Sequence, residues 1–69
     1  MSKQPVWTAV EAERELLRAG FVLLRSKGSH RIYFRDGRRV VIPFHKGRTL
    51  HPKIVRQVLD AIGDERESP

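Results

Sequence analysis

The histidine at position 30 is the residue whose type and surroundings most directly suggest chemistry. It follows Lys27, Gly28 and Ser29 and precedes Arg31, so two cations flank it in the sequence beside a small turn. A histidine imidazole accepts or donates a proton near neutral pH. Cleavage of an RNA phosphodiester needs such a group, because a base takes the 2′-hydroxyl proton, an acid protonates the leaving 5′-oxygen, and cations stabilise the phosphorane. The alternative is a histidine that binds phosphate without catalysis or ends a strand.

The polar residues around His30 and in a second basic segment are candidate contacts for a phosphate backbone. Lys46 and Arg48 flank Gly47 in a predicted loop that also holds His45. The second proton-transfer group stays open between water, His45 and Lys46. The residues expected to contact RNA are Lys27, Ser29, Arg31, Arg39, Lys46 and Arg48.

Three further residues have roles that favour structure over chemistry. Tyr33 either stacks on a base or covers the sheet. His51, next to Pro52, fits the N-cap of a helix better than a ligand. Trp7 fits a hydrophobic staple or a core position.

The net charge of +6 is unevenly distributed along the 69 residues. Residues 21–56 hold ten lysines and arginines against one acid, Asp36, which gives a local net charge of +9. The two ends together hold four bases and seven acids. A basic middle predicts a polyanionic partner. Nucleic acid fits better than a membrane surface, because the bases fall in strands and loops rather than on one amphipathic helix.

The composition excludes several classes of protein. Cysteine is absent, so no disulfide or thiolate site is expected. Three scattered histidines without clustered carboxylates argue against a bound metal, and no other cofactor is expected. No apolar run is long enough to span a membrane, and the N-terminus lacks a signal-peptide core. We therefore expect one cytoplasmic domain over residues 1–69, with an ordered core at about 7–63 between a short N-terminal tail and an acidic C-terminal tail.

The first predicted element is a helix that starts after Thr8 and runs to about Ala19. Thr8 and Glu11 have the spacing of a capping box, in which each side chain accepts from the other residue's backbone N–H. Gly20 suits the left-handed residue that ends a helix.

Three strands are predicted over residues 21–25, 31–35 and 39–43. The last two flank Asp36 and Gly37, which signal a hairpin with a two-residue or a three-residue loop. We prefer the three-residue loop with Gly37 left-handed, because it separates a core face from a basic face. This register puts Ile32, Phe34, Val40 and Ile42 in the core, and Arg31, Tyr33, Arg39 and Val41 on the basic face.

The last predicted element is a helix that opens with Pro52, runs to about Ile62 and ends at Gly63. The order α-β-β-β-α predicts an α+β fold, in which two helices cover one face of a three-stranded antiparallel sheet. This is the layout of a double-stranded-RNA-binding domain.

The ordered motifs of the chain resemble those of the HicA family of toxins from type II toxin–antitoxin systems. The matching segments are LLRAGFVLLRSKGSHRIYF and DGRRVVIPFHKGRTLHPKIVRQVL, and the resemblance covers about residues 8–63. Two places differ from many members of the family. Arg31 stands where a second histidine follows the first, and residues 51–54 stand where Lys-Pro-Gly-Thr opens the last helix.

The resemblance implies an mRNA-cleaving ribonuclease of double-stranded-RNA-binding-like fold, with a single catalytic histidine that corresponds to His30. It also implies that cleavage inhibits translation, and that a cognate HicB antitoxin neutralises the toxin, partly by covering that histidine. The reaction is expected to need no metal. Two hypotheses compete: a non-catalytic RNA-binding module that uses the same basic surface, and an interaction protein whose basic surface docks an acidic partner.

Overall fold

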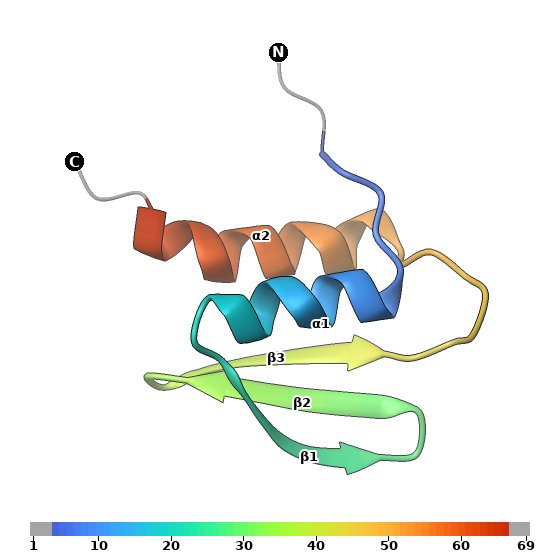
Figure 1. Ribbon diagram of the computed structural model, residues 1–69, viewed down its shortest axis with the longest axis horizontal. Helices are drawn as coiled ribbons and strands as arrows, with labels where there is room; N and C mark the ends of the chain where they lie inside the picture. The colour runs from blue at the N-terminus through green and yellow to red at the C-terminus, as the bar shows by residue number, and fades with distance from the viewer. Residues whose placement is uncertain (1–3, 67–69) are drawn as a thin grey trace.

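Two helices pack on one face of a three-stranded antiparallel sheet (Figure 1). The computed structural model describes residues 4–66, with side chains as far as Gly63. The predicted α+β fold and its element order are confirmed. The strands lie in the order β1-β2-β3. The elements are α1 (Ala9–Arg18), β1 (Val22–Lys27), β2 (His30–Arg35), β3 (Arg38–Pro43) and α2 (Pro52–Arg66).

The predicted capping box starts α1. The Thr8 hydroxyl accepts a hydrogen bond from the Glu11 N–H at 3.3 Å, and the Thr8 N–H donates to the Glu11 carboxylate at 2.9 Å. These bonds satisfy backbone donors that no helical carbonyl can reach, and such a cap is worth about 1 kcal/mol.

The end of α1 is also as predicted. Gly20 adopts a left-handed conformation with φ +98°. The N–H groups of Gly20 and Phe21 donate to the carbonyls of Leu17 and Leu16, each at 3.0 Å. This pair of bonds is a Schellman motif, and it turns the chain from α1 into β1.

The second helix begins as predicted and ends later than predicted. The Lys53 N–H donates to Nδ1 of His51 at 3.0 Å, so His51 caps α2. The prediction that Gly63 ends this helix is wrong, because α2 continues to Arg66. Gly63 keeps a negative φ, so it costs helix propensity without breaking the hydrogen-bond ladder. Of the predicted acidic tail, residues 64–66 are helical, and residues 67–69, like 1–3 of the N-terminal tail, lie outside the described part.

The preferred register of the second hairpin is wrong. Arg35 pairs with Arg38 across a two-residue turn of Asp36 and Gly37, which both have positive φ, +45° and +81°. This is the turn geometry that matches the twist of antiparallel strands. Tyr33 therefore pairs with Val40 and points to the helices. Val40 and Ile42 are buried as predicted, whereas Phe34 and Ile32 lie on the face without helices.

The register set by the two-residue turn places charged residues of β2 on the helix-covered face. This is favourable because those residues form hydrogen bonds with α1 and its C-terminal end. Arg31 and Arg35 share the helix-covered face with Tyr33, since alternate residues of a strand point to the same side. Arg31 is bonded to Glu13, and Arg35 donates to the carbonyl of Ala19 at the end of α1. From the sequence alone this register is disfavoured, because it mixes apolar and charged groups on both faces of the sheet. The bonds to α1 make it favourable, because they satisfy the charged groups on the helix-covered face.

The core fills the space between the helices and the sheet. The starts of the two helices are joined by a hydrogen bond from the Leu50 N–H to the Trp7 carbonyl at 2.7 Å and by a β-bridge between Thr8 and Thr49. Trp7 itself packs against the core, as predicted. No helix within residues 4–66 is long and apolar enough to cross a membrane. The buried core residues are Ala9, Ala12, Leu16, Phe21, Tyr33, Val40, Ile42, Leu50, Val55, Val58 and Ala61.

Candidate functional site

The basic residues singled out by the sequence fall mainly at one end of the molecule. Both helices begin there, and the β1–β2 turn and the segment that joins β3 to α2 lie beside them (Figure 1). We call this the loop end; it comprises residues 27–31, residues 44–51 and the first turns of α1 and α2. The opposite end, the hairpin end, comprises the β2–β3 turn and the last turn of α1. The two ends differ in whether their polar side chains stabilise the fold or are available to a ligand.

The turn that carries His30 has two central residues, Gly28 and Ser29. Lys27 and His30 face each other as the closing pair of the β1–β2 hairpin. Gly28 has φ +59°, which suits the first central position of a type II′ turn. All four residues are exposed, and the His30 imidazole has no hydrogen bond or ion pair to any described side chain. The tight turn therefore presents His30 to solvent beside a lysine.

His30 lies on the face of the sheet that no helix covers, here called the open face. It alternates along β2 with Arg31 and so shares its side with Ile32 and Phe34. Its partner on β3 is Pro43. Phe34 and Val41 remain 37% and 36% exposed on this face, so it combines exposed apolar side chains with cations. The cations of the open face are Arg25, Lys27 and Arg39.

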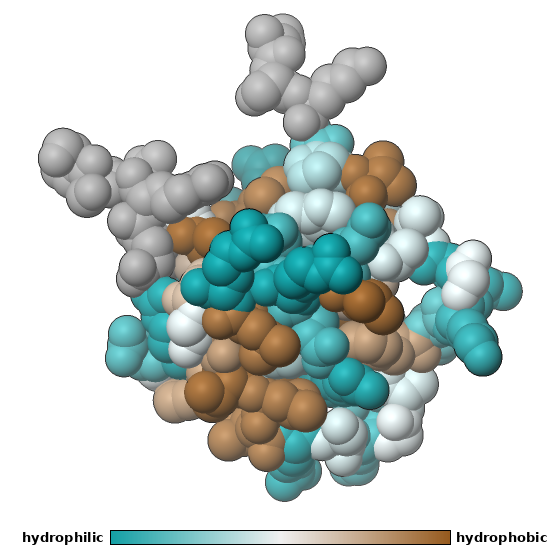
Figure 2. Space-filling view, viewed as in Figure 1, coloured by the Kyte–Doolittle hydropathy of each residue, from teal (hydrophilic) through white to brown (hydrophobic). Residues whose placement is uncertain are grey.

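A larger exposed apolar area surrounds the start of β1. Leu17, Val22, Leu23 and Leu24 are each between 44% and 55% exposed. Figure 2 shows apolar side chains gathered over the region where β1 begins, with mostly polar side chains over the loop end. A bulge between Leu23 and Arg25 shifts the register of β1 against β2 here. This group of exposed apolar side chains thus lies away from the turn that carries His30.

Arg31 points to the other side of the sheet from His30. Its guanidinium bonds the Glu13 carboxylate at 2.8 Å and lies 4.1 Å from the centroid of the Phe44 ring. The hydrogen bond to Glu13 raises the pKa of Arg31 above its usual value. The side chain is 39% exposed, so it retains N–H groups that face solvent while it holds β2 to α1.

Tyr33 is fully buried beneath the helices, so of its two predicted roles it has the structural one. Its hydroxyl donates to the same Glu13 oxygen that Arg31 binds. Burial raises the pKa of the Tyr33 phenol well above its usual value, and the bond to Glu13 raises it further. Glu13 thus joins a buried phenol and a partly exposed guanidinium to α1.

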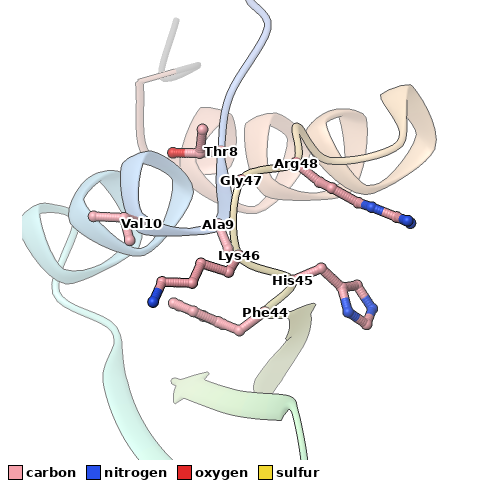
Figure 3. Close-up of a pocket in the computed structure, with 8 residues that line it drawn as sticks. All are labelled: Thr8, Ala9, Val10, Phe44, His45, Lys46, Gly47 and Arg48. Carbon is pink, nitrogen blue, oxygen red and sulfur yellow. The ribbon is translucent and has the colours of Figure 1, made fainter.

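The loop from β3 to α2 lies next to the His30 turn. The Phe44 N–H donates to the carbonyl of Ser29 at 2.6 Å, which fixes the start of the loop to the turn. Gly47 has φ +73°, and the Arg48 N–H closes a short turn onto the His45 carbonyl. In Figure 3 the side chains of Phe44 and Lys46 extend along the same side of the loop toward α1, and those of His45 and Arg48 extend the other way. Basic groups therefore face both sides of this loop.

The structure brings some of the predicted contact residues together and separates others. Lys27, Ser29 and His30 form one turn, and Lys46 and Arg48 lie on the loop bonded to it. Arg39 is farther along the open face, where it pairs with Phe34. Arg31 is on the opposite face. Contact with RNA stays a prediction for each of these residues.

The sequence analysis missed two residues of this end, Glu13 and Phe44. Glu13 had a signal, because it lies four residues after Ala9 and three before Leu16 on the buried stripe of α1. A carboxylate on such a stripe requires a buried partner. Phe44 follows Pro43 outside the alternating pattern of β3, so nothing in the sequence indicated that its ring would lie under Arg31.

The described residues contain no group of three or more histidines, cysteines or carboxylates placed to hold a metal ion. No curated protein matches this chain in sequence. The family model described as HicA toxin of bacterial toxin–antitoxin systems matches residues 9–63, which cover α1, the sheet, the loop end and α2 as far as Gly63. The chain therefore belongs to the HicA family of toxins of bacterial toxin–antitoxin systems.

Proposed function

We propose that this toxin is an endoribonuclease that cleaves mRNA and so inhibits translation, with His30 as its catalytic residue. The observation that carries the proposal is the exposed His30 imidazole, which no described side chain engages, at the closing pair of a tight turn with Lys27 opposite. A structural histidine is normally fixed by a partner, as His51 is at the start of α2. His30 is instead available to a ligand.

The proposed reaction is an intramolecular transesterification. The 2′-oxygen attacks the neighbouring phosphorus, the bond from phosphorus to the 5′-oxygen breaks, and a 2′,3′-cyclic phosphate and a 5′-hydroxyl end result. His30 takes the 2′-hydroxyl proton or supplies the proton of the leaving oxygen. Lys27, Lys46 and Arg48 neutralise the phosphorane, and the Ser29 hydroxyl orients the phosphate. Every step proceeds without a metal ion.

We also propose that a cognate HicB-type antitoxin neutralises the toxin by covering His30. The open face supports this, because Phe34 and Val41 lie exposed on the same side of the sheet as His30, next to Arg25 and Arg39. Apolar contacts ringed by cations suit an acidic protein partner. Phe34→Glu should weaken the complex in titration calorimetry; an unchanged affinity places the antitoxin elsewhere.

The deciding experiment compares His30→Ala with Arg38→Ala. Both residues open a strand directly after a two-residue turn, but they lie at opposite ends of the molecule. Single-stranded RNA is incubated with each variant in EDTA, at temperatures where circular dichroism shows equal folded fractions. His30→Ala should lose about 10²- to 10⁴-fold in cleavage rate, the usual contribution of a general acid or base. Arg38→Ala should keep wild-type activity per folded molecule.

Other outcomes identify the competing hypotheses. If the wild type binds RNA in a salt-dependent manner but never cleaves it in EDTA, the protein is a non-catalytic RNA-binding module. If it has no affinity for RNA, the basic surface serves a protein partner. Cleavage by His30→Ala at the wild-type rate would show that another residue carries the chemistry.

A further inference from the structure

The loop end contains a hollow whose apolar interior has no role in the proposed cleavage mechanism, although Lys46 and Arg48 at its edge do. It has a volume of about 410 Å³ and lies between the first turn of α1 and the loop from β3 to α2 (Figure 3). This volume is in the range of small-ligand sites. The lining residues are Thr8, Ala9, Val10, Phe44, His45, Lys46, Gly47 and Arg48.

The hollow combines an apolar interior with a basic edge. Phe44 and Val10 provide the apolar surface. Val10 is 55% exposed, so the packing of α1 against the core does not explain an apolar side chain at this position. Lys46 extends along the Phe44 ring in Figure 3. No acidic side chain is among the lining residues. An aromatic ring with cations around it fits an anionic ligand that has a flat apolar part.

The Phe44 ring is held in position before any ligand arrives. The Arg31 guanidinium lies 4.1 Å from its centroid, and Glu13 fixes that guanidinium. The backbone of Phe44 is fixed by its hydrogen bond to Ser29. A ring restrained by both its side chain and its backbone loses little freedom on binding, which favours stacking.

The same hydrogen bond ties the hollow to the turn that carries His30. Ser29 directly precedes His30, and Pro43, the cross-strand partner of His30, directly precedes Phe44. The two sites are therefore adjacent along the backbone but face different sides of the sheet, because the Phe44 ring lies with Arg31 on the helix-covered side and His30 lies on the open face.

We propose that this hollow binds one unpaired base of the RNA, against the Phe44 ring, close to the turn that carries His30. Unpaired RNA bases are recognised by stacking on aromatic side chains with cations along the backbone. The position of the scissile phosphate rests on the proposed function; base binding in the hollow does not. Such a site predicts a preference for single-stranded over double-stranded RNA.

The first test uses nuclear magnetic resonance of the full chain with AMP, UMP and ribose 5-phosphate. Both nucleotides should shift the amide resonances of Val10, Phe44 and Gly47, and ribose 5-phosphate, which lacks a base, should not. Equal shifts with ribose 5-phosphate would reduce the site to a phosphate contact and overturn the proposal. Shifts confined to the open face around Phe34 would overturn it as well.

The second test compares Phe44→Leu with Phe34→Leu, each in the His30→Ala background, so that RNA stays intact. Binding of a single-stranded tetranucleotide, followed by fluorescence anisotropy, should weaken about tenfold in Phe44→Leu, because one stacking contact is lost. Phe34→Leu should leave it unchanged. The reverse pattern would assign stacking to the open face.

Val10→Glu covers the case in which Phe44→Leu unfolds. Val10 is exposed in the first turn of α1, where a carboxylate favours the helix dipole, so this variant keeps the fold. Its charge at the hollow should weaken tetranucleotide binding several-fold; unchanged affinity would contradict the proposal. If nucleotides bind in the hollow but the wild type cleaves no RNA, the base site is supported and the proposed nuclease activity is wrong. If cleavage needs His30 but nucleotides cause no shifts in the hollow, the nuclease activity is supported and the base site is wrong.

Discussion

Two hairpin turns of the same length bound β2, and they differ in what their flanking side chains do. Gly28 and Ser29 form the turn at the loop end, and Asp36 and Gly37 form the turn at the hairpin end. Each relies on a glycine with positive φ. The two turns have the same length but different backbone types, since only Gly28 has positive φ in the first and both Asp36 and Gly37 do in the second. The difference that bears on function is in the flanking side chains.

At the hairpin end the flanking arginine is part of the fold. Arg35 donates to the Ala19 carbonyl, lies 5.4 Å from the centroid of the Phe21 ring and is only 20% exposed. At the loop end, His30 and Lys27 are exposed and engage no described side chain. A two-residue turn therefore stabilises the fold where its flanking polar side chains have partners within the protein. Where they have none among the described residues, as at His30 and Lys27, those side chains are available to bind a ligand.

The largest effect that sharpens this comparison is expected from Arg35→Ala. The change removes a charged hydrogen bond at the C-terminus of α1 and a cation–π contact, so it should lower the free energy of unfolding by about 2–3 kcal/mol. Urea denaturation measures the loss. Arg39→Ala, an exposed arginine on the open face, is the matched control and should change stability by less than about 0.5 kcal/mol. Equal losses in the two variants would remove the structural role of Arg35.

The two glycines provide the next test. Gly28→Ala and Gly37→Ala should each lower the free energy of unfolding by about 1–2 kcal/mol, because alanine resists positive φ. A Cβ atom at either position meets nothing within 4 Å, so backbone strain is the whole effect. Only Gly28→Ala should also reduce RNA cleavage per folded molecule. Asparagine tolerates the left-handed conformation and should recover most of the stability at Gly37, but not at Gly28, because the first central position of a type II′ turn favours glycine. Loss of cleavage in Gly37→Ala would break the comparison.

The smallest effect concerns the anchor of the loop end to α1. The pKa of Tyr33 is raised in the folded protein above the value of 10.0 for a free phenol. Above pH 10 the unfolded chain therefore loses a proton that the folded protein keeps, so stability falls as pH rises, by at most about 1.4 kcal/mol per pH unit. Below pH 10 the group contributes no pH dependence.

Thermal melts between pH 9 and 11 measure this slope, and Tyr33→Phe should flatten it. Tyr33 is the single tyrosine of the chain, so phenolate absorbance reports its ionisation directly. The absorbance should rise together with unfolding. Ionisation of Tyr33 in the folded protein near pH 10 would show that the phenol is neither buried nor bonded to Glu13 in solution.

Local signals in the sequence were enough to predict most of the fold. Thr8 and Glu11 identified the start of α1, Gly20 its end, and Pro52 the start of α2. The hairpin register was wrong because it depends on a tertiary contact. Glu13 accepts both Tyr33 and Arg31, and only with α1 in place is it favourable to turn those two residues inward.

The part of the candidate site that depends on the β1–β2 turn could be predicted from the sequence. The part that depends on packing between distant segments could not. The glycine before Ser29 indicated a tight turn that exposes His30, and the exposed His30 agrees with that expectation. The opposite facings of His30 and Arg31 follow from strand alternation once His30 is known to lie inside β2. The hollow at Phe44 could not be predicted, since it forms from α1 and a loop about 35 residues later in the sequence.

The loop from β3 to α2 is fastened at both of its ends by backbone hydrogen bonds. Phe44 is bonded to Ser29, and Leu50 is bonded to Trp7. Backbone bonds do not depend on side-chain identity, so the exposed residues between these two points contribute little to folding. Exchanging this segment between related toxins, with Gly47 kept for its positive φ, should therefore preserve the scaffold and test whether the proposed RNA contacts of Lys46 and Arg48 decide which RNA is bound.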